Sequence, residues 1–176
     1  LVAVPTAFWH EFTRQMIAAD LEIPRRLRTF IIGGEAARVD VMDAWHRHVM
    51  GTALVNSYGP TEATVSAFAG VSGPGTDYEY ASIGRPILTV AAAIVDADDR
   101  HVAPGEWGEL LLSGDQLATG YLGLPEKTDE VFVTRADGQR WYRTGDRARQ
   151  RPDGDDLVSG RFDAQLKIHG HGIEPG

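Results

Sequence analysis

The sequence predicts an α/β fold in which a layered first half is followed by a second half made almost entirely of strands. In the first half, apolar residues at helical spacing alternate with short β-branched runs. After residue 83 little helical periodicity remains, and short apolar runs are separated by turn-forming pairs such as Asp-Gly and Pro-Gly. The chain has 176 residues, and its 43% hydrophobic and 24% charged content is ordinary for a protein with a buried core.

Residues 1–82 are predicted to alternate helix and strand. Apolar residues recur at helical spacing over residues 7–19, which predicts a helix. A β-branched run over residues 28–32, stopped by a Gly-Gly pair, predicts a buried strand. A second amphipathic helix is predicted over residues 41–49, and a further strand over residues 53–55. Because strand, helix and strand follow in this order, we expect parallel pairing with right-handed crossovers.

Residues 83–162 are predicted to form a small sheet or an open barrel. Strands are expected over residues 90–95 and 109–112, and a later one over residues 166–168. Turns between the strands are expected at Asp98-Asp99, Pro104-Gly105, Asp137-Gly138 and Asp153-Gly154.

Composition excludes several classes of function. The 17 basic and 25 acidic residues give a net charge of −8, which argues against nonspecific binding to nucleic acid. There is no Cys, so the chain offers no disulfide framework and no thiolate nucleophile. No apolar run approaches the roughly 20 residues of a membrane helix, so we expect no membrane span and a cytoplasmic protein. The chain starts at Leu1 inside an apolar run, and we expect it to be a piece of a longer protein.

The densest group of candidate ligand-binding residues lies just after the strand predicted over residues 53–55. Ligands of α/β sheets bind beyond the carboxyl ends of the strands, and a Gly-Pro pair opens the backbone there. An aromatic ring (Tyr58), a hydroxyl (Thr61) and a carboxylate (Glu62) suit a planar base, a phosphate oxygen and a hard cation such as Mg²⁺. The alternative is a capped turn, with Thr61 as helix N-cap and Glu62 in the first helical turn. Residue types alone favour the capped turn.

Two further groups carry weaker signals. The segment Gly33-Gly34-Glu35-Ala36 joins a predicted strand to a predicted helix, where backbone N–H groups could approach a ligand. The alternative there is a tight turn. Asp146 and Arg161 could bind two vicinal hydroxyls and a ribose or phosphate oxygen, or could be an ordinary surface ion pair.

The order and spacing of these groups are more specific than any one of them. The series consists of residues 33–36, 56–62, 83–86, 108–122, 142–146 and 160–168. It resembles the adenylation domain of nonribosomal peptide synthetases, within the adenylate-forming superfamily that also holds acyl-CoA synthetases and luciferases. The resemblance runs along essentially the whole chain. Its Asn-x-Tyr-Gly-Pro-Thr-Glu and Tyr-Arg-Thr-Gly-Asp forms favour the peptide synthetases.

The resemblance implies the architecture. The chain would be part of the large N-terminal subdomain of an adenylate-forming enzyme, with an α/β sheet layer over residues 1–82. A small distorted β-barrel would follow over residues 83–162. Asp163 would be the hinge that opens a C-terminal subdomain, of which residues 163–176 would be the start, so that the chain is cut just after the hinge.

The resemblance also implies the activity. A carboxylic acid, an amino acid in the peptide synthetases, would attack the α-phosphate of ATP to give an acyl-adenylate and pyrophosphate. The acyl group would then pass to the phosphopantetheine thiol of a peptidyl carrier domain, which works with a condensation domain of the same assembly line. Adenine would lie between Tyr58 and the backbone of Gly34 to Ala36, with Asn56 at its amino edge.

The resemblance assigns residues to three roles. The catalytic residues would be Thr61, on phosphate, and Glu62, on Mg²⁺. Asp146 would bind the ribose hydroxyls with help from Arg161. The nucleotide-binding set would be Gly34, Glu35, Ala36, Asn56, Ser57, Tyr58, Gly59, Thr61, Asp146 and Arg161. The acyl pocket would draw on Ala3, Ile31, Gly33, Ser57, Val65 and Ser66.

The sequence departs from the family at three points, and two alternative interpretations stay open. The upstream phosphate-binding loop and the catalytic lysine of the C-terminal subdomain are absent from the 176 residues, so we expect this chain alone to be inactive. Val158 stands where the family usually has an aromatic residue. An acyl-CoA ligase or a stand-alone aryl- or fatty-acid adenylating enzyme would use the same chemistry. A non-catalytic nucleotide-binding fragment is the alternative from another class.

Overall fold

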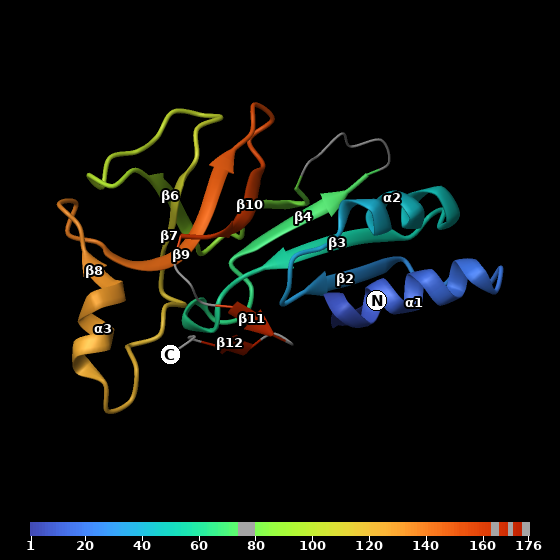
Figure 1. The fold of residues 1–176 in the computed structure, drawn as a ribbon, viewed down its shortest axis with the longest axis horizontal. Helices are drawn as coiled ribbons and strands as arrows, with labels where there is room; N and C mark the ends of the chain where they lie inside the picture. Colours follow the sequence, from blue (N-terminus) through green and yellow to red (C-terminus); the bar gives the residue numbers. More distant parts are fainter. Residues whose placement is uncertain (74–79, 163–165, 169–170, 174–176) are drawn as a thin grey trace.

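One continuous path of hydrogen-bonded strands organises the chain (Figure 1). The computed structural model describes residues 1–73, 80–162, 166–168 and 171–173. Within them, ten strands form one sheet in the order β1-β2-β3-β4-β5-β10-β9-β7-β6, with β8 beside β9. The layered half and the β-rich half therefore share a sheet, and they join where β5 lies between β4 and β10.

The strands of this sheet are β1 (Val2–Pro5), β2 (Thr29–Gly33), β3 (Ala53–Tyr58), β4 (Phe68–Ser72), β5 (Ser82–Pro86), β6 (Ala91–Val95), β7 (Gly108–Ser113), β8 (Phe132–Thr134), β9 (Arg140–Gln150) and β10 (Asp156–Arg161). The helical elements are α1 (Thr6–Ala18), α2 (Val39–His48), α3 (Pro125–Val131) and the 3-10 turn η1 (Thr61–Ala63). A separate hairpin pairs β11 (Leu166–Ile168) with β12 (His171–Ile173).

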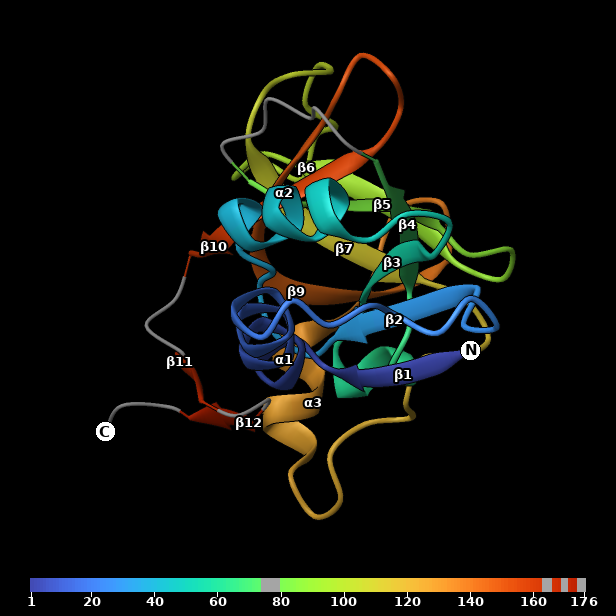
Figure 2. The same cartoon turned by 90° about the vertical axis from the view of Figure 1, so that its right-hand side faces the viewer.

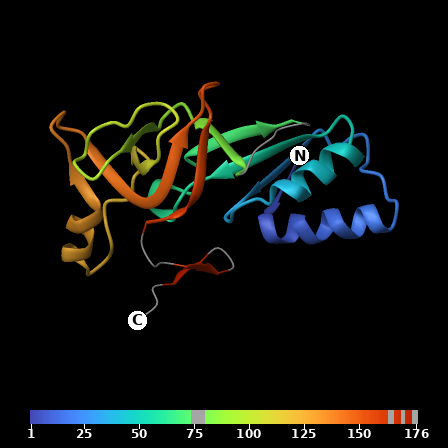
Figure 3. The same cartoon turned by 45° about the horizontal axis from the view of Figure 1, so that its top comes forward.

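The first half has the predicted α/β layering. β1, β2 and β3 pair in parallel, and α1 and α2 lie on the same side of them (Figures 2 and 3). Because successive strand residues point to opposite faces, Phe30, Ile32 and Leu54 all turn toward the helices and are buried there. They pack against Trp9 of α1 and Trp45 of α2, whose ring centroids lie 5.9 Å apart. The predicted helices and strands of this half are confirmed to within a few residues at their ends.

The second half is antiparallel. β9 is the longest strand, with 11 residues, and curves through this half to pair with β7, β8 and β10 (Figure 1). The predicted strands over residues 90–95, 109–112 and 166–168 correspond to β6, β7 and β11. β5 begins at the expected boundary between the halves and pairs with β4 on one side and β10 on the other.

The second half also contains one helix that the sequence analysis did not predict, α3, which runs over Pro125–Val131. This helix buries none of its residues, so it has no apolar stripe for a periodicity analysis to detect. Its Pro stands in the first helical turn, where a missing N–H costs no hydrogen bond.

The expected absence of a membrane span and the expected hinge remain to be compared with the structure. No helix in the part of the chain that the structure describes combines the length and the apolar character that a membrane span requires. Asp163, the predicted hinge residue, lies outside the described residues.

Candidate functional site

A cavity of about 990 Å³ lies where the two halves of the sheet meet. One wall comes from the carboxyl ends of β2 and β3 and the loop that leads into α2. The other wall comes from β5, β9 and β10. Of the residues predicted to bind nucleotide, those that line the cavity are Gly34, Glu35, Ala36, Asn56, Ser57, Tyr58, Gly59, Asp146 and Arg161.

The most buried charged group of this wall is the carboxylate of Asp146, whose residue is 3% exposed. Its Oδ1 lies 3.1 Å from Nη1 of Arg161, the directly paired residue on β10. Its Oδ2 accepts a hydrogen bond from the hydroxyl of Tyr58, at the end of β3. The alternative interpretation of Asp146 and Arg161 as a surface ion pair is therefore wrong, because both side chains are largely buried at the cavity wall.

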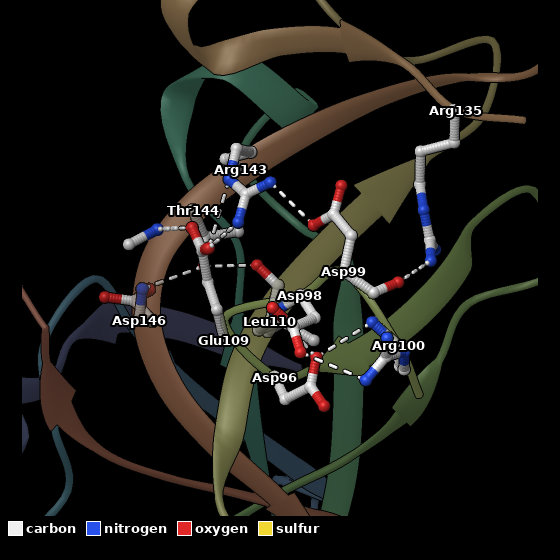
Figure 4. Close-up of polar contacts among 11 residues, drawn as sticks. Asp96, Asp98, Asp99, Arg100, Glu109, Leu110, Arg135, Arg143, Thr144 and Asp146 are labelled. Carbon is white, nitrogen blue, oxygen red and sulfur yellow. Dashed lines mark hydrogen bonds and ion pairs between the residues drawn. The ribbon is translucent and has the colours of Figure 1, made fainter. Parts of the chain in front are cut away.

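A bulge in β9 directs Asp146 to this position. Between the pairs Glu109↔Arg147 and Leu111↔Arg143, β7 advances two residues while β9 advances four. The hydroxyl of Thr144 holds the bulge, because it donates to the carbonyl oxygen of Leu110 (2.7 Å) and accepts from the N–H of Asp146 (3.0 Å; Figure 4). Bulges re-aim side chains locally in this way.

Tyr58 presents a polar edge as well as an aromatic face. Burial and the neighbouring Asp146 carboxylate raise the pKa of the Tyr58 phenol well above its usual value, so the hydroxyl keeps its proton and donates it. The ring packs edge-on against Phe68, with centroids 5.9 Å apart. Asn56, two residues earlier on β3, donates from Nδ2 to the carbonyl oxygen of Ser82 (2.8 Å). That bond leaves Oδ1 of Asn56 as the amide's acceptor.

Thr61 and Glu62 do not line the cavity but follow it directly in the chain, in η1. The residue at the N-cap position of this turn is Pro60, and no side chain caps it, so the capped-turn interpretation of Thr61 is wrong. One carboxylate oxygen of Glu62 accepts a hydrogen bond from the hydroxyl of Tyr121. Among the described residues there is no group of three or more Asp, Glu, His or Cys side chains that could hold a metal ion without other ligands.

The predicted acyl-pocket residues come mainly from the face of β1, β2 and β3 that is turned away from the helices. Ala3 pairs with Ile31 across β1 and β2, and Gly33 pairs with Ser57 across β2 and β3. A Cβ at Gly33 would lie 2.7 Å from the carbonyl oxygen of Ser57, so only glycine fits there. The hydroxyls of Ser57 and Ser66 lie 2.9 Å apart and form a hydrogen bond, so Ser66 also belongs to this group of residues. Val65 is 75% exposed.

Sequence reasoning missed three contributors to the site. Tyr80 lines the cavity and packs edge-on against Trp107 (5.6 Å between centroids), but it follows no motif. Tyr121 lies in the motif segment 108–122, but its hydrogen bond to Glu62 spans 59 positions of sequence. Glu109 accepts a hydrogen bond from the backbone N–H of Gly145 (3.2 Å), a contact that only the bulge in β9 makes possible.

Comparison with known proteins agrees with this architecture. The family model described as AMP-binding enzyme matches residues 1–122. Novobiocin biosynthesis protein H of Streptomyces niveus is 46% identical over 85% of this chain and 25% of its own length. Tyrocidine synthase 2 of Brevibacillus parabrevis is 45% identical over 85% of this chain and 4% of its own length. The chain thus spans a quarter or less of these two relatives.

Solved structures share the fold. Holo-PA1221, a nonribosomal peptide synthetase protein that contains adenylation and PCP domains, superposes with a TM-score of 0.84 at 29% identity, over 97% of this chain and 30% of its own. An artificially fused adenylation-PCP di-domain, NpsA-ThdA from Klebsiella oxytoca, superposes with a TM-score of 0.86 over 98% of this chain and 34% of its own. Its 22% identity supports the fold alone.

Proposed function

Because the chain belongs to the family of AMP-binding enzymes, we propose that it forms the nucleotide site of an enzyme that activates an amino acid, or another carboxylic acid, as an acyl-adenylate. The substrate carboxylate attacks the α-phosphorus of ATP, and the bond from that phosphorus to the oxygen of pyrophosphate breaks. Both the curated relatives and the superposed structures include nonribosomal peptide synthetases, which supports an amino acid as the acid.

The buried Asp146 carboxylate in the cavity wall is the observation that carries this proposal. A carboxylate offers about four acceptor positions. Tyr58 and Arg161 occupy two of them and fix the plane of the group. The remaining two can accept hydrogen bonds from the vicinal hydroxyls of a ribose.

The base and the phosphates bind to residues next to Asp146 in the site. Adenine lies between the Tyr58 ring and the backbone of Gly34 to Ala36, where the positive φ of Gly34 (+89°) and the open space beside it allow close approach. Asn56 Oδ1 accepts from the amino group of the base. Thr61 contacts phosphate.

Glu62 is the residue that would hold Mg²⁺. A single carboxylate suits this ion, because Mg²⁺ on nucleotides is held by one or two carboxylates together with phosphate oxygens and water. Tyr121 orients the carboxylate by its hydrogen bond to one of the two oxygens. The ion would neutralise negative charge on the phosphates when bound.

The acid would occupy the face of the sheet beside the nucleotide. Small groups at Ala3, Gly33 and Ser57 leave room there, and the paired hydroxyls of Ser57 and Ser66 make one wall mildly polar. Ile31 supplies an apolar wall, and Val65 would close over the bound acid.

The second half-reaction requires a partner, since the chain has no Cys and hence no thiol. The acyl group would pass to the phosphopantetheine thiol of a peptidyl carrier domain, which is supported by the PCP domain of holo-PA1221. A condensation domain of the same assembly line would then consume the product, in the cytoplasm. Residues 1–82 and 83–162 would form the two parts of the large subdomain, with Asp163 as the hinge to residues 163–176.

The test is amino-acid-dependent exchange of radioactive pyrophosphate into ATP by the protein that contains this chain. Asp146→Asn, which keeps the shape but removes the charge and one acceptor, is expected to lower exchange about 50-fold, the effect of losing one or two charge-assisted hydrogen bonds. Asp98→Asn, at an exposed turn, is the matched control. Glu62→Gln is expected to raise the Mg²⁺ concentration needed for half-maximal exchange. Wild-type exchange by Asp146→Asn would refute the proposal.

A further inference from the structure

We propose that Glu109 is a positioning residue for the ribose-binding carboxylate: through the N–H of Gly145 it holds the bulge of β9 that aims Asp146 into the cavity, where Asp146 pairs with Arg161 of β10. This inference rests on the proposed function of Asp146. Glu109 itself does not line the cavity, so it acts on the site only through the backbone.

The two carboxylate oxygens of Glu109 have separate partners. Oε1 accepts from the N–H of Gly145 at 3.2 Å. Oε2 accepts from Nε and Nη2 of Arg143, at 3.1 and 2.6 Å (Figure 4). The guanidinium thus holds the carboxylate turned so that its other oxygen faces the bulge.

The same guanidinium is fixed from its far side. Nη1 of Arg143 donates to Oδ1 of Asp99 (2.8 Å) in the turn between β6 and β7. The side chains of Arg143 and Glu109 are only 28% and 18% exposed, so this network is screened less by water than a surface pair. A cluster of this kind also loses less side-chain freedom for each bond formed, because Arg143 is already held when Glu109 binds it.

Gly145 is anchored at both of its polar atoms. Its N–H donates to Glu109, and its carbonyl oxygen accepts from the N–H of Phe162 at 2.8 Å. Asp146 follows Gly145 directly, and Phe162 follows Arg161 directly. The left-handed backbone of Gly145 (φ +70°) therefore adjoins both residues of the ion pair, Asp146 along the chain and Arg161 through its neighbour Phe162.

The consequence is specific to the ribose. Thr144 and Phe162 hold the N–H and the carbonyl oxygen of the peptide that joins Gly145 to Asp146. The N–H of the peptide before it, between Thr144 and Gly145, is held by Glu109, and without this bond that peptide can rotate. Rotation of that peptide would turn the Asp146 carboxylate and break the alignment of its free acceptors. The backbone of Gly34 to Ala36 and the side chain of Asn56 make none of these contacts, since Asn56 Nδ2 donates to Ser82 instead.

The test compares binding of AMP, 2′-deoxy-AMP and 3′-deoxy-AMP by the protein that contains this chain and its variants. For Glu109→Ala we expect the affinity for AMP to fall about tenfold, the loss of one charge-assisted hydrogen bond. We expect the two deoxy analogues to lose much less, so that the preference for AMP shrinks. Glu109→Gln keeps an acceptor for Gly145, and it should restore most of the preference. Arg100→Ala removes the exposed ion pair with Asp98 on the same turn and should leave the affinities for all three nucleotides unchanged.

The outcomes separate this inference from the proposed function. If the wild-type protein binds AMP no better than its deoxy analogues, the ribose role of Asp146 fails. If the wild type prefers AMP and Glu109→Ala keeps the full preference, the positioning role of Glu109 fails alone. Amide hydrogen exchange gives a readout without nucleotide: the N–H groups of Gly145 and Phe162 should exchange faster in Glu109→Ala and stay protected in Arg100→Ala. Unchanged protection in Glu109→Ala would overturn the inference.

Discussion

The carboxyl of Asp156 should make the stability of this fold depend on pH. Asp156 opens β10, is 3% exposed, and its Oδ1 has no hydrogen-bond partner among the described residues. Burial raises its pKa from 3.8 to about 6, and the charge of Asp155 adds to the shift while the side chain of Gln150 opposes it. A rise of roughly two units corresponds to at most about 3 kcal/mol between the protonated and the ionised group.

The sign follows from which state binds the proton more tightly. Because the pKa is raised on folding, the stabilising contribution is complete below about pH 4 and is lost as the pH rises through about 6. Asp156→Asn removes this titration. The free energy of unfolding of the variant relative to the wild type should therefore increase by up to about 3 kcal/mol between pH 4 and pH 7.

Urea denaturation at half-unit steps from pH 4 to pH 7.5 measures this difference directly. Asp153→Asn, in the adjoining turn and half exposed, is the matched control. A flat difference for Asp156→Asn over the same range would refute the reasoning, since it would mean that the carboxyl titrates alike in the folded and unfolded chains.

Three further predictions concern packing and are measured by urea denaturation at pH 7. Gly84→Ala should lower the free energy of unfolding by about 4 kcal/mol or more, since its Cβ would lie 2.2 Å from the carbonyl oxygen of Ala69. The control Gly51→Ala has the same φ but open space around it, and should lower it by only about 1–2 kcal/mol. Equal losses would contradict the close approach at Gly84. Tyr58→Phe should cost about 1–3 kcal/mol, because it takes a donor from the buried Asp146 carboxylate; no loss would contradict that bond. Trp45→Ala should cost about 3–5 kcal/mol, because the fully buried ring leaves a large cavity; a cost under 1 kcal/mol would contradict its place in the core.

The layered half was the more predictable part of the fold. Its helices and strands carry periodic apolar residues, because α1 and α2 each bury one stripe against β1, β2 and β3. β9 escaped prediction because four arginines interrupt its apolar residues, and the pattern of a half-buried strand was masked by charge. α3 could not be predicted because it buries no residue and so shows no apolar periodicity.

The candidate site, too, was only partly predictable from the sequence. Its cavity-lining residues could be found from motif order, since glycines and polar groups at strand ends stand close together in the sequence. The partners of those residues could not. The contact of Tyr58 with Asp146 spans 88 positions, and that of Glu62 with Tyr121 spans 59, so neither leaves a local signal. The role of Glu109 depends on the extra residues of β9, which only the strand register shows.

The central claim is that the cavity between the two halves binds an adenine nucleotide through Asp146. A crystal structure of the protein that contains this chain, with AMP bound, tests it most directly. We expect adenine against the Tyr58 ring beside Gly34 to Ala36, and both ribose hydroxyls within hydrogen-bond distance of the Asp146 carboxylate. Density for AMP elsewhere, or a ribose turned away from Asp146, would contradict it.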